Sequence, residues 1–414
     1  MGSGLRMTVL VPSSAGEEWR ERQQPFTPES IDELPEQCYA FFLNANDYPP
    51  ADGRREKILA HFDVPEFLAN QTCFELNGFF GSKPTYSDFK DPITNQPHVT
   101  SLTTWFRCLI KMVKKVPEDS HDDGPEYATG KKDYKWFETT VFTRWDYPKR
   151  NQILCIDVPH DISTNMAKLL SKQSCPPLDF RDPFALHSTL IDQLIVYSDV
   201  AVWRIRDPVR SLEKSRMRTG AIFSTIHDIS RHAIHASEIL EAAVDTLKEL
   251  QRCRTAIHER LADDLEETYK AQARDYTQFQ ISLLKNLKLR SDSNRERLKN
   301  EINLAFNNLT RQDNSVLKSI ALLTMIFLPA TFISALFSTT FFAYGEDGGW
   351  EVSDKMWIYW ATTIPSTIGI VIIWRLWIGY SDGIMGFVQA RKNWCWKLWA
   401  SRKEGRKESK LDAA

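Results

Sequence analysis

The chain has 414 residues, a formal net charge of −2 and a mean hydropathy of −0.38. This length allows more than one domain, the hydropathy is too low for a membrane protein with many spans, and the charge excludes a general nucleic-acid binder. The seven cysteines form no CxxC pair, which disfavours a zinc site or a disulfide framework and indicates a reducing compartment. The N-terminus lacks the apolar core of a signal peptide, so we expect the N-terminal part to stay on the cytosolic or matrix side.

The first part of the chain predicts a tail and then a folded head. Residues 1–35 are rich in Pro, Glu, Ser and Gln, a composition typical of disorder. Residues 36–183 alternate β-prone runs with Pro/Gly/Asp-rich breaks, which predicts a soluble α/β head. The strand candidates are 38–43, 73–81, 103–113, 136–145 and 151–158.

Shorter features complete the predicted head. We expect helices at Arg54–His61 and Asp161–Lys172, a hairpin turn at Asp146–Arg150 and a surface loop from Lys114 to Lys135. The order of the strands does not follow from the sequence.

Residues 184–318 predict a helical stalk. Apolar residues recur at helical spacing over 184–214, 221–250 and 261–289. The run Ser291–Asn294, with Glu296 close behind, is typical of a helix start. We therefore expect one further helix from Asn294 to Phe342, which runs from the aqueous side into a membrane.

Two apolar stretches predict a membrane hairpin. No charged side chain lies between Lys318 and Glu346, or between Lys355 and Arg375. Each gap is long enough for a helix to cross a hydrocarbon core of roughly 30 Å. We expect a first transmembrane helix at 319–344, an external loop at 345–355 and a second transmembrane helix at 356–377.

Charge predicts the orientation of this hairpin. The loop is acidic and the segment 378–414 is basic, so the head and the tail lie on the inner side. The loop acids, which would raise the local cation concentration or serve only solubility, are Glu346, Asp347, Glu351 and Asp354. The tail also contains Trp394, Trp396 and Trp399, which favour an anchor on anionic lipid; the alternative is a disordered basic tail.

A polar seam follows the first membrane helix at alternating steps of three and four residues, as the a and d positions of a coiled coil do. The polar seam consists of Asn300, Asn303, Asn307, Thr310, Asn314, Leu317, Ala321, Thr324, Leu328, Thr331, Ala335 and Ser338. Copies of this helix around one axis would stack rings of Asn and Thr oxygens that hold a hydrated cation, with Leu317 and Leu328 as apolar collars. The alternative is that small and polar residues only allow close packing of two helices. A separate apolar stripe for packing contains Leu298, Ile302, Ala305, Leu309 and Val316.

Other motifs point away from catalysis and cofactors. His232, His235 and Glu238 share a helix at spacings that suit metal ligands, but a packing or solvent face is the preferred interpretation. No P-loop, GxGxxG, HExxH or nucleophile elbow is present, which argues against ATP-driven transport and against an enzyme.

The segments 287–307, 327–337 (FLPATFISALF) and 357–365 (WIYWATTIP) resemble the CorA-type metal ion transporter superfamily, specifically its divergent fungal CorA-like members. The resemblance covers residues 184–380. It implies a homopentamer with a cytosolic α/β funnel, a long-helix stalk and a two-helix transmembrane hairpin. The Gly-Met-Asn signature of the family, which holds a hydrated magnesium ion at the outer entrance, falls on Ser338, Thr339 and Thr340.

Two functions follow as hypotheses. The first is a passive divalent-cation channel of the magnesium type, driven by the electrochemical gradient. Its expected partners are other copies of the same chain and the lipid bilayer, and no cofactor is expected. The second is a membrane-tethered scaffold or metal sensor that has kept the fold and lost conduction, because Ser338 and Thr340 replace the Gly and Asn of the signature. The sequence identifies neither the membrane nor the ion.

Overall fold

The computed structural model describes most of the chain in two compact units, Met1–Ala305 and Phe306–Ala414. The described residues are 6–13, 18–42, 54–90, 97–115, 126–127, 132–159, 161–171, 176–215, 221–261, 264–338, 342–344 and 349–376. Each unit is described by itself.

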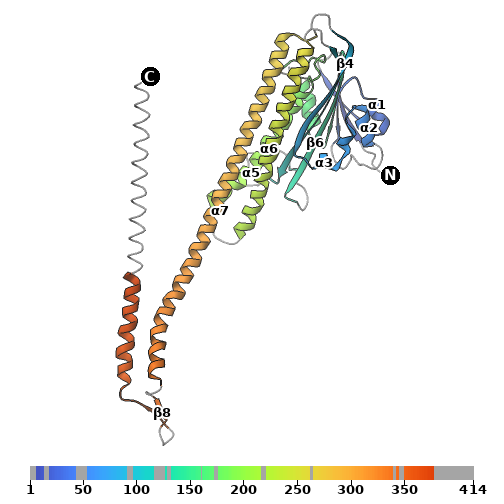
Figure 1. Ribbon diagram of the computed structural model, residues 1–414. Helices are drawn as coiled ribbons and strands as arrows, with labels where there is room; N and C mark the ends of the chain where they lie inside the picture. Colours follow the sequence, from blue (N-terminus) through green and yellow to red (C-terminus); the bar gives the residue numbers. More distant parts are fainter. Residues whose placement is uncertain are drawn as a thin grey trace, which may run out of the picture. The chain divides into compact units, whose positions relative to one another are not determined.

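The first unit is built on a seven-stranded sheet of order β2-β1-β3-β7-β6-β5-β4 (Figure 1). Its strands are β1 (Arg6–Pro12), β2 (Trp19–Pro25), β3 (Gln37–Phe42), β4 (Gly78–Lys90), β5 (Pro97–Val113), β6 (Tyr134–Asp146) and β7 (Arg150–Ile156). The β3–β7 pair is parallel and the other neighbouring pairs are antiparallel. The predicted turn at Asp146–Arg150 is confirmed, since it joins β6 to β7 in register from Asp146 opposite Arg150.

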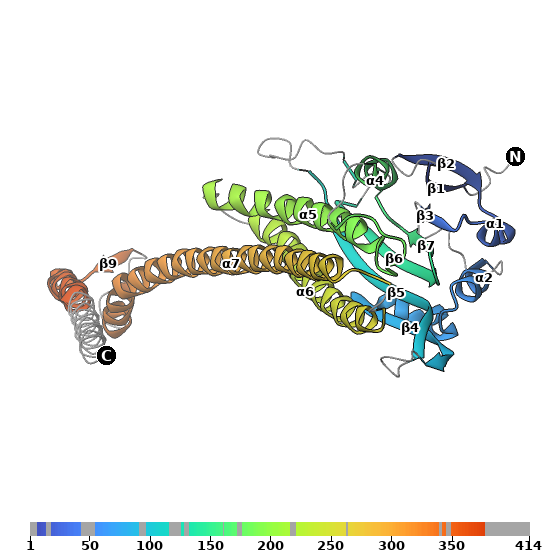
Figure 2. The ribbon, with the colours of Figure 1, turned by 90° about the horizontal axis from the view of Figure 1, so that it is seen from above.

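Helices cover both faces of this sheet (Figure 2). One face carries the short elements α1 (Pro28–Asp32), α2 (Arg54–His61), η2 (Glu66–Ala69) and α3 (Gln71–Glu75). The other carries α4 (Ile162–Leu170), α5 (His187–Ser215), α6 (Ala221–Arg260) and the first part of α7 (Glu267–Phe337). The layered α/β head is therefore confirmed, and the predicted helix at Arg54–His61 coincides with α2.

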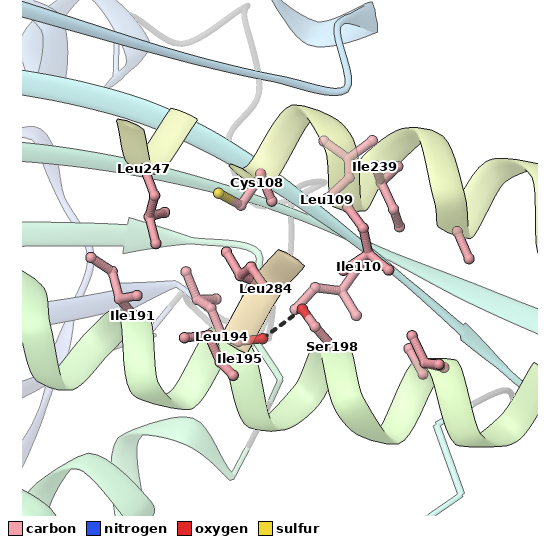
Figure 3. A pocket seen from close by; sticks show the side chains of 15 residues that line it. Cys108, Leu109, Ile110, Ile191, Leu194, Ile195, Ser198, Ile239, Leu247 and Leu284 are labelled. Atoms are coloured by element: carbon pink, nitrogen blue, oxygen red, sulfur yellow. Dashed lines mark hydrogen bonds between the residues drawn. The ribbon is translucent and has the colours of Figure 1, made fainter. Parts of the chain in front are cut away.

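The main core lies between the sheet and the long helices. Figure 3 shows side chains of β5, α5, α6 and α7 converging there around a small apolar cavity. Cys108 and Ile110 point from β5 toward Leu194 of α5 and Leu284 of α7. Burial of such side chains contributes roughly 1.5–3 kcal/mol each, so this layer is the main source of stability for the head.

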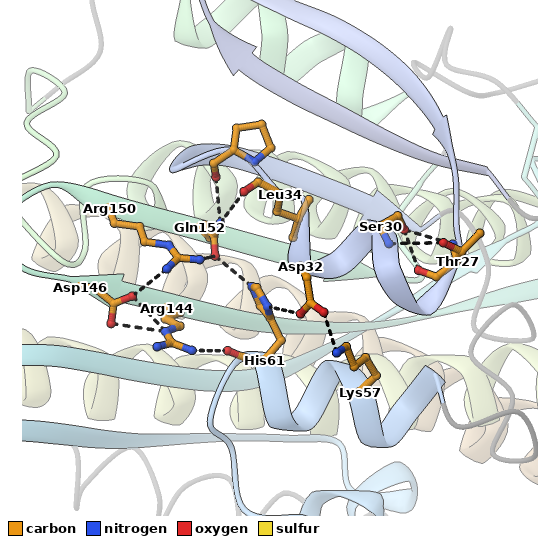
Figure 4. A network of polar contacts seen from close by, with 11 residues as sticks. Thr27, Ser30, Asp32, Leu34, Lys57, His61, Arg144, Asp146, Arg150 and Gln152 are labelled. Carbon is orange, nitrogen blue, oxygen red and sulfur yellow. Dashed lines mark hydrogen bonds and ion pairs between the residues drawn. The ribbon is translucent and has the colours of Figure 1, made fainter.

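A second set of contacts fastens the short helices to the opposite face (Figure 4). His61 at the end of α2 lies with Nε2 3.0 Å from Oε1 of Gln152 on β7, and with Nδ1 3.4 Å from Asp32 of α1. Arg144 of β6 donates to the His61 carbonyl oxygen at 2.6 Å. Side chains of four elements thus meet at one buried histidine.

The structure corrects the predicted N-terminal tail. Arg6–Pro12 and Trp19–Pro25 are strands, and Pro28–Asp32 is a helix with a capping box between Thr27 and Ser30. The composition of β2 is misleading because β2 is an edge strand that buries Trp19 and leaves most of its polar residues exposed. Polar and charged residues are common on sheet edges, where they discourage pairing with other chains.

One strand prediction and one helix prediction are also corrected. Within 73–81, predicted as a strand, residues up to Glu75 belong to α3 and only Gly78 onward is strand. The expected break at Ser291–Asn294 is absent, because α7 is continuous from Glu267 to Phe337. Asp292 caps no helix there; it accepts from Ser237 of α6 and from Lys288 at 3.0 Å.

A buried polar cluster ties α7 to the rest of the head. Asp182 is fully buried and accepts hydrogen bonds from Nε2 of His258 at 2.9 Å, from the Tyr269 hydroxyl at 3.0 Å and from the Phe184 amide at 2.9 Å. Burial acts to raise the pKa of Asp182, but the charge and hydrogen bond of His258, the charge of Arg254 and the hydrogen bond from the Phe184 amide hold it well below its usual range. The carboxylate is thus kept ionised inside the head, where an unpaired charge is costly.

The second unit contains the end of α7, two short strands and the Met356–Leu376 helix. β8 (Phe342–Tyr344) and β9 (Trp350–Val352) pair antiparallel. The first membrane helix therefore ends at Phe337 rather than at 344, and the external loop contains a strand that the sequence analysis did not predict.

Candidate functional site

Within the part of the chain that the structure describes, two helices are long and apolar enough to cross a membrane: the C-terminal part of α7, and Met356–Leu376. In α7 almost all of the described residues of this apolar window are uncovered within the single chain. Large apolar side chains exposed there include Val316, Leu317, Ile320, Leu323, Ile326, Phe327, Leu328 and Phe332. Such a continuous apolar surface requires lipid or other protein copies to cover it.

Every residue of the polar seam is exposed on the isolated chain. Near its start, Leu298 is 1% exposed and packs with Ile205 and Val209 of α5, while Ile302 lies against the same cluster. The head thus uses Leu298 and Ile302, at the start of the apolar stripe, for its own packing and leaves Asn300 and Asn303 uncovered. Oxygen-bearing side chains of the seam are therefore available to groups outside this chain.

The seam threonines have a defined hydrogen-bond arrangement. Thr310, Thr324 and Thr331 donate to the carbonyl oxygens of Phe306, Ile320 and Phe327 at 2.9–3.0 Å. A hydroxyl that donates its only proton to its own helix keeps its oxygen lone pairs available as acceptors. These hydroxyls can therefore accept hydrogen bonds from ion-bound water, but they cannot donate a hydrogen bond to it.

Apolar residues interrupt the polar ones. Leu317 and Leu328 of the seam are 61% and 65% exposed, and Pro329 beside Leu328 is buried while α7 continues through it. An open groove between the two membrane helices is lined by Pro329, Thr331, Phe332 and Ser366, among others. The helices are joined nearer the loop, where Ser334 Oγ lies 2.9 Å from Tyr359 Oη.

The predicted entrance is described only in part. Ser338 follows the last residue of α7 and is exposed. Thr339 and Thr340 lie outside the described residues, as do Glu346, Asp347 and the tail 378–414. Of the other loop acids, Glu351 lies in β9 opposite Ala343, and Asp354 is exposed just before the second membrane helix.

His232 and His235 of α6 have protein partners. His232 Nε2 lies 3.2 Å from Asp133, and His235 Nδ1 lies 2.8 Å from Nζ of Lys111. Across the described ranges no group of three or more His, Cys, Asp or Glu side chains is arranged to hold a metal ion. The packing interpretation of these histidines therefore fits the contacts, and the Lys111 partner is one that the sequence analysis missed.

Comparisons with known proteins agree with this architecture. A curated protein of Aspergillus versicolor, "Notoamide biosynthesis cluster protein M'", is 32% identical over 270 residues. The alignment covers 57% of this chain and 58% of that protein, so the chain spans less than two thirds of the relative's length.

Two solved structures show the same fold. The full-length CmaX protein matches with a TM-score of 0.52 at 14% identity, over 90% of this chain and 98% of that one. The complete CorA magnesium transporter of Methanocaldococcus jannaschii matches with a TM-score of 0.51 at 14% identity, over 91% and 98%. The family model described as "CorA-like Mg2+ transporter protein" matches residues 168–379. With about half of its length in that match, the chain belongs to the CorA-like family.

Proposed function

We propose that the chain is a passive divalent-cation channel of the magnesium type, assembled as a homopentamer, with the polar seam lining its pore. The observation that carries the proposal is the uninterrupted exposure of the seam along one helix of a CorA-like chain. The bilayer would cover the rest of the apolar surface, with the head on the inner side.

The chemistry of the seam supports this assignment. Removal of bound water from magnesium is energetically costly. A magnesium pore is therefore expected to have side chains that accept hydrogen bonds from the water molecules bound to the ion. Asn carboxamide oxygens and the Thr310, Thr324 and Thr331 hydroxyls are such acceptors. Leu317 and Leu328 would form apolar constrictions that close the pore by excluding water.

The driving force would be the electrochemical gradient of the cation, to which the membrane potential contributes. Movement of one elementary charge across 100 mV is worth about 2.3 kcal/mol, so a divalent ion gains about twice that amount. The acids of the external loop would concentrate cations at the entrance formed by Ser338, Thr339 and Thr340.

The test is flux through the purified protein in liposomes that contain a metal-sensitive dye, with magnesium, zinc, cobalt and nickel added in turn. We expect magnesium uptake that increases with an inside-negative potential. Asn314→Leu replaces a polar ring with an apolar one and should abolish flux while the oligomer on size-exclusion chromatography stays intact. Absence of flux with every metal would contradict the proposal.

The second candidate is a membrane-tethered scaffold or sensor that does not conduct. Ser338 favours it, because a side chain stands where the family signature has a glycine. Under this alternative the oligomer forms, but neither the wild type nor Asn314→Leu shows cation flux.

A further inference from the structure

Lys111 of β5 is a buried lysine with unusual partners. It is 2% exposed, and its Nζ lies 2.8 Å from Nδ1 of His235, 4.5 Å from the Tyr134 ring centroid and 4.9 Å from that of Trp136. Buried lysines are normally paired with a carboxylate. Here an imidazole and two aromatic faces hold the ammonium group instead.

This contact fixes the protonation state of His235. An ammonium group only donates, so Nδ1 of His235 must accept, and the imidazole is neutral with its proton on Nε2. Protonation would place a hydrogen on Nδ1, pointing at Lys111, and would bring two positive charges to 2.8 Å. Burial, together with the charges of Lys111 and Arg231, accordingly lowers the pKa of His235.

The surrounding charges do not relieve this conflict. The positive groups nearby are Arg231 on α6 and Lys132 beside Tyr134. The acids are Glu238 on α6, which is exposed, and Asp133, which already accepts from His232. Among the described residues, Nδ1 of His232 is buried without a hydrogen-bond partner, and burial lowers the pKa of His232 as well.

The contact joins α6 to the sheet, because Lys111 belongs to β5, Tyr134 and Trp136 belong to β6, and His235 belongs to α6. Trp136 also lies against His235, with ring centroids 5.9 Å apart. We propose that His235 and Lys111 form a proton-sensitive contact that holds α6 against β5 and β6 at neutral pH and releases it in acid.

The direction of this pH effect follows from the linkage between protonation and folding. A histidine whose pKa is lower in the packed head than in the open chain binds its proton better when the contact is open. The contact is therefore at full strength above about pH 6.5, the ordinary histidine value, and weakens as the pH falls below it. Burial and Arg231 lower the pKa of Lys111 to about 8, so this lysine still carries its charge in that range.

The test is hydrogen–deuterium exchange of the full-length protein in lipid nanodiscs at pH 7.5 and 5.5, with labelling times scaled for the intrinsic exchange rate. In the wild type we expect protection of peptides around 228–240 to fall by up to about tenfold in acid, because pH 5.5 lies about one unit below the ordinary pKa of histidine. His235→Gln keeps an acceptor for Lys111 but cannot titrate in this range, so its protection should persist at pH 5.5.

His227→Gln is the matched control, because His227 lies on the same helix and is exposed. It should retain the acid response of the wild type. Lys111→Met is a second variant: without the ammonium group, His235 protonates at a higher pH and the loss of protection becomes smaller. Equal loss of protection in the wild type and His235→Gln, or no loss in the wild type, would overturn the proposal.

Discussion

The two halves of α7 differ in where their packing partners come from. In the half that belongs to the head, Thr277 and Gln280 are fully buried, and Leu284 packs in the main core. In the half that follows Phe306, described side chains are mostly exposed, whether apolar or polar. The first half is therefore stabilised by its own chain, whereas the second half depends on surroundings that a single chain lacks.

The largest stability effect should come from the buried cluster that anchors the first half. Asp182→Ala leaves His258, Tyr269 and the Phe184 amide without their acceptor, so we expect a loss of about 3–5 kcal/mol, as for other broken buried ion pairs. Denaturant unfolding of the full-length protein in detergent measures it. Asp179→Ala, which removes the partly exposed ion pair with Arg181, is the control and should cost less than about 1 kcal/mol.

A leucine comparison separates the two halves more directly. Leu284→Ala creates a cavity in the core and should cost about 2–5 kcal/mol. Leu328→Ala should leave the unfolding of the head unchanged and, by widening a constriction, should increase cation flux. Thermal unfolding and liposome flux of both variants provide the measurement, and a destabilised head in Leu328→Ala would refute the distinction.

Acid should weaken the head through His187, which is fully buried and lies 3.1 Å from Thr104 Oγ1. Burial and the neighbouring Arg254 lower its pKa to about 3. Because the unfolded chain binds this proton near pH 6.5, the stability contributed by neutral His187 is complete above that pH and falls as the pH drops toward 3. Between pH 6.5 and 5 the loss is about 2 kcal/mol, at about 1.4 kcal/mol per unit.

His187→Gln removes this titration and should flatten the dependence of the unfolding free energy on pH over the same interval. The measurement is urea unfolding at half-unit steps of pH. An unchanged slope would show that other groups carry the acid sensitivity.

The smallest effect is expected in the membrane hairpin. Tyr359→Phe removes the hydrogen bond to Ser334, and side-chain hydrogen bonds between membrane helices contribute about 0.6 kcal/mol on average. Thr362→Val is a suitable control, since the Thr362 hydroxyl bonds only within its own helix among the contacts described for it. In detergent micelles, we expect the melting temperature of Tyr359→Phe to lie slightly below that of Thr362→Val.

The sequence was informative where local patterns decide structure. The helix at Arg54–His61 and the strands through 103–113 and 136–145 follow from periodicity and turn residues. It was uninformative where distant partners decide: Asp292 looks like a helix cap but bonds Ser237, which is 55 positions away. Lys111 and His235 are 124 positions apart, so only the fold reveals their contact, although the spacing of His232 and His235 marked that helix face.

The polar seam itself was readable from sequence, because a spacing of three and four residues on a helix needs no knowledge of distant contacts. Which way the seam faces is a different matter. Its orientation depends on other copies and on lipid, and neither is encoded in a local pattern. The exposure of the seam leaves the proposed inward orientation as the central claim.

Asn307 and Asn308 offer the most direct test of that claim. They are adjacent, chemically identical and both exposed, but successive residues point about 100° apart around a helix, and only Asn307 lies on the seam. We predict that Asn307→Leu reduces magnesium flux in liposomes by at least about tenfold and that Asn308→Leu retains it. Equal flux in the two variants, or a loss confined to Asn308→Leu, would contradict a pore lined by this seam.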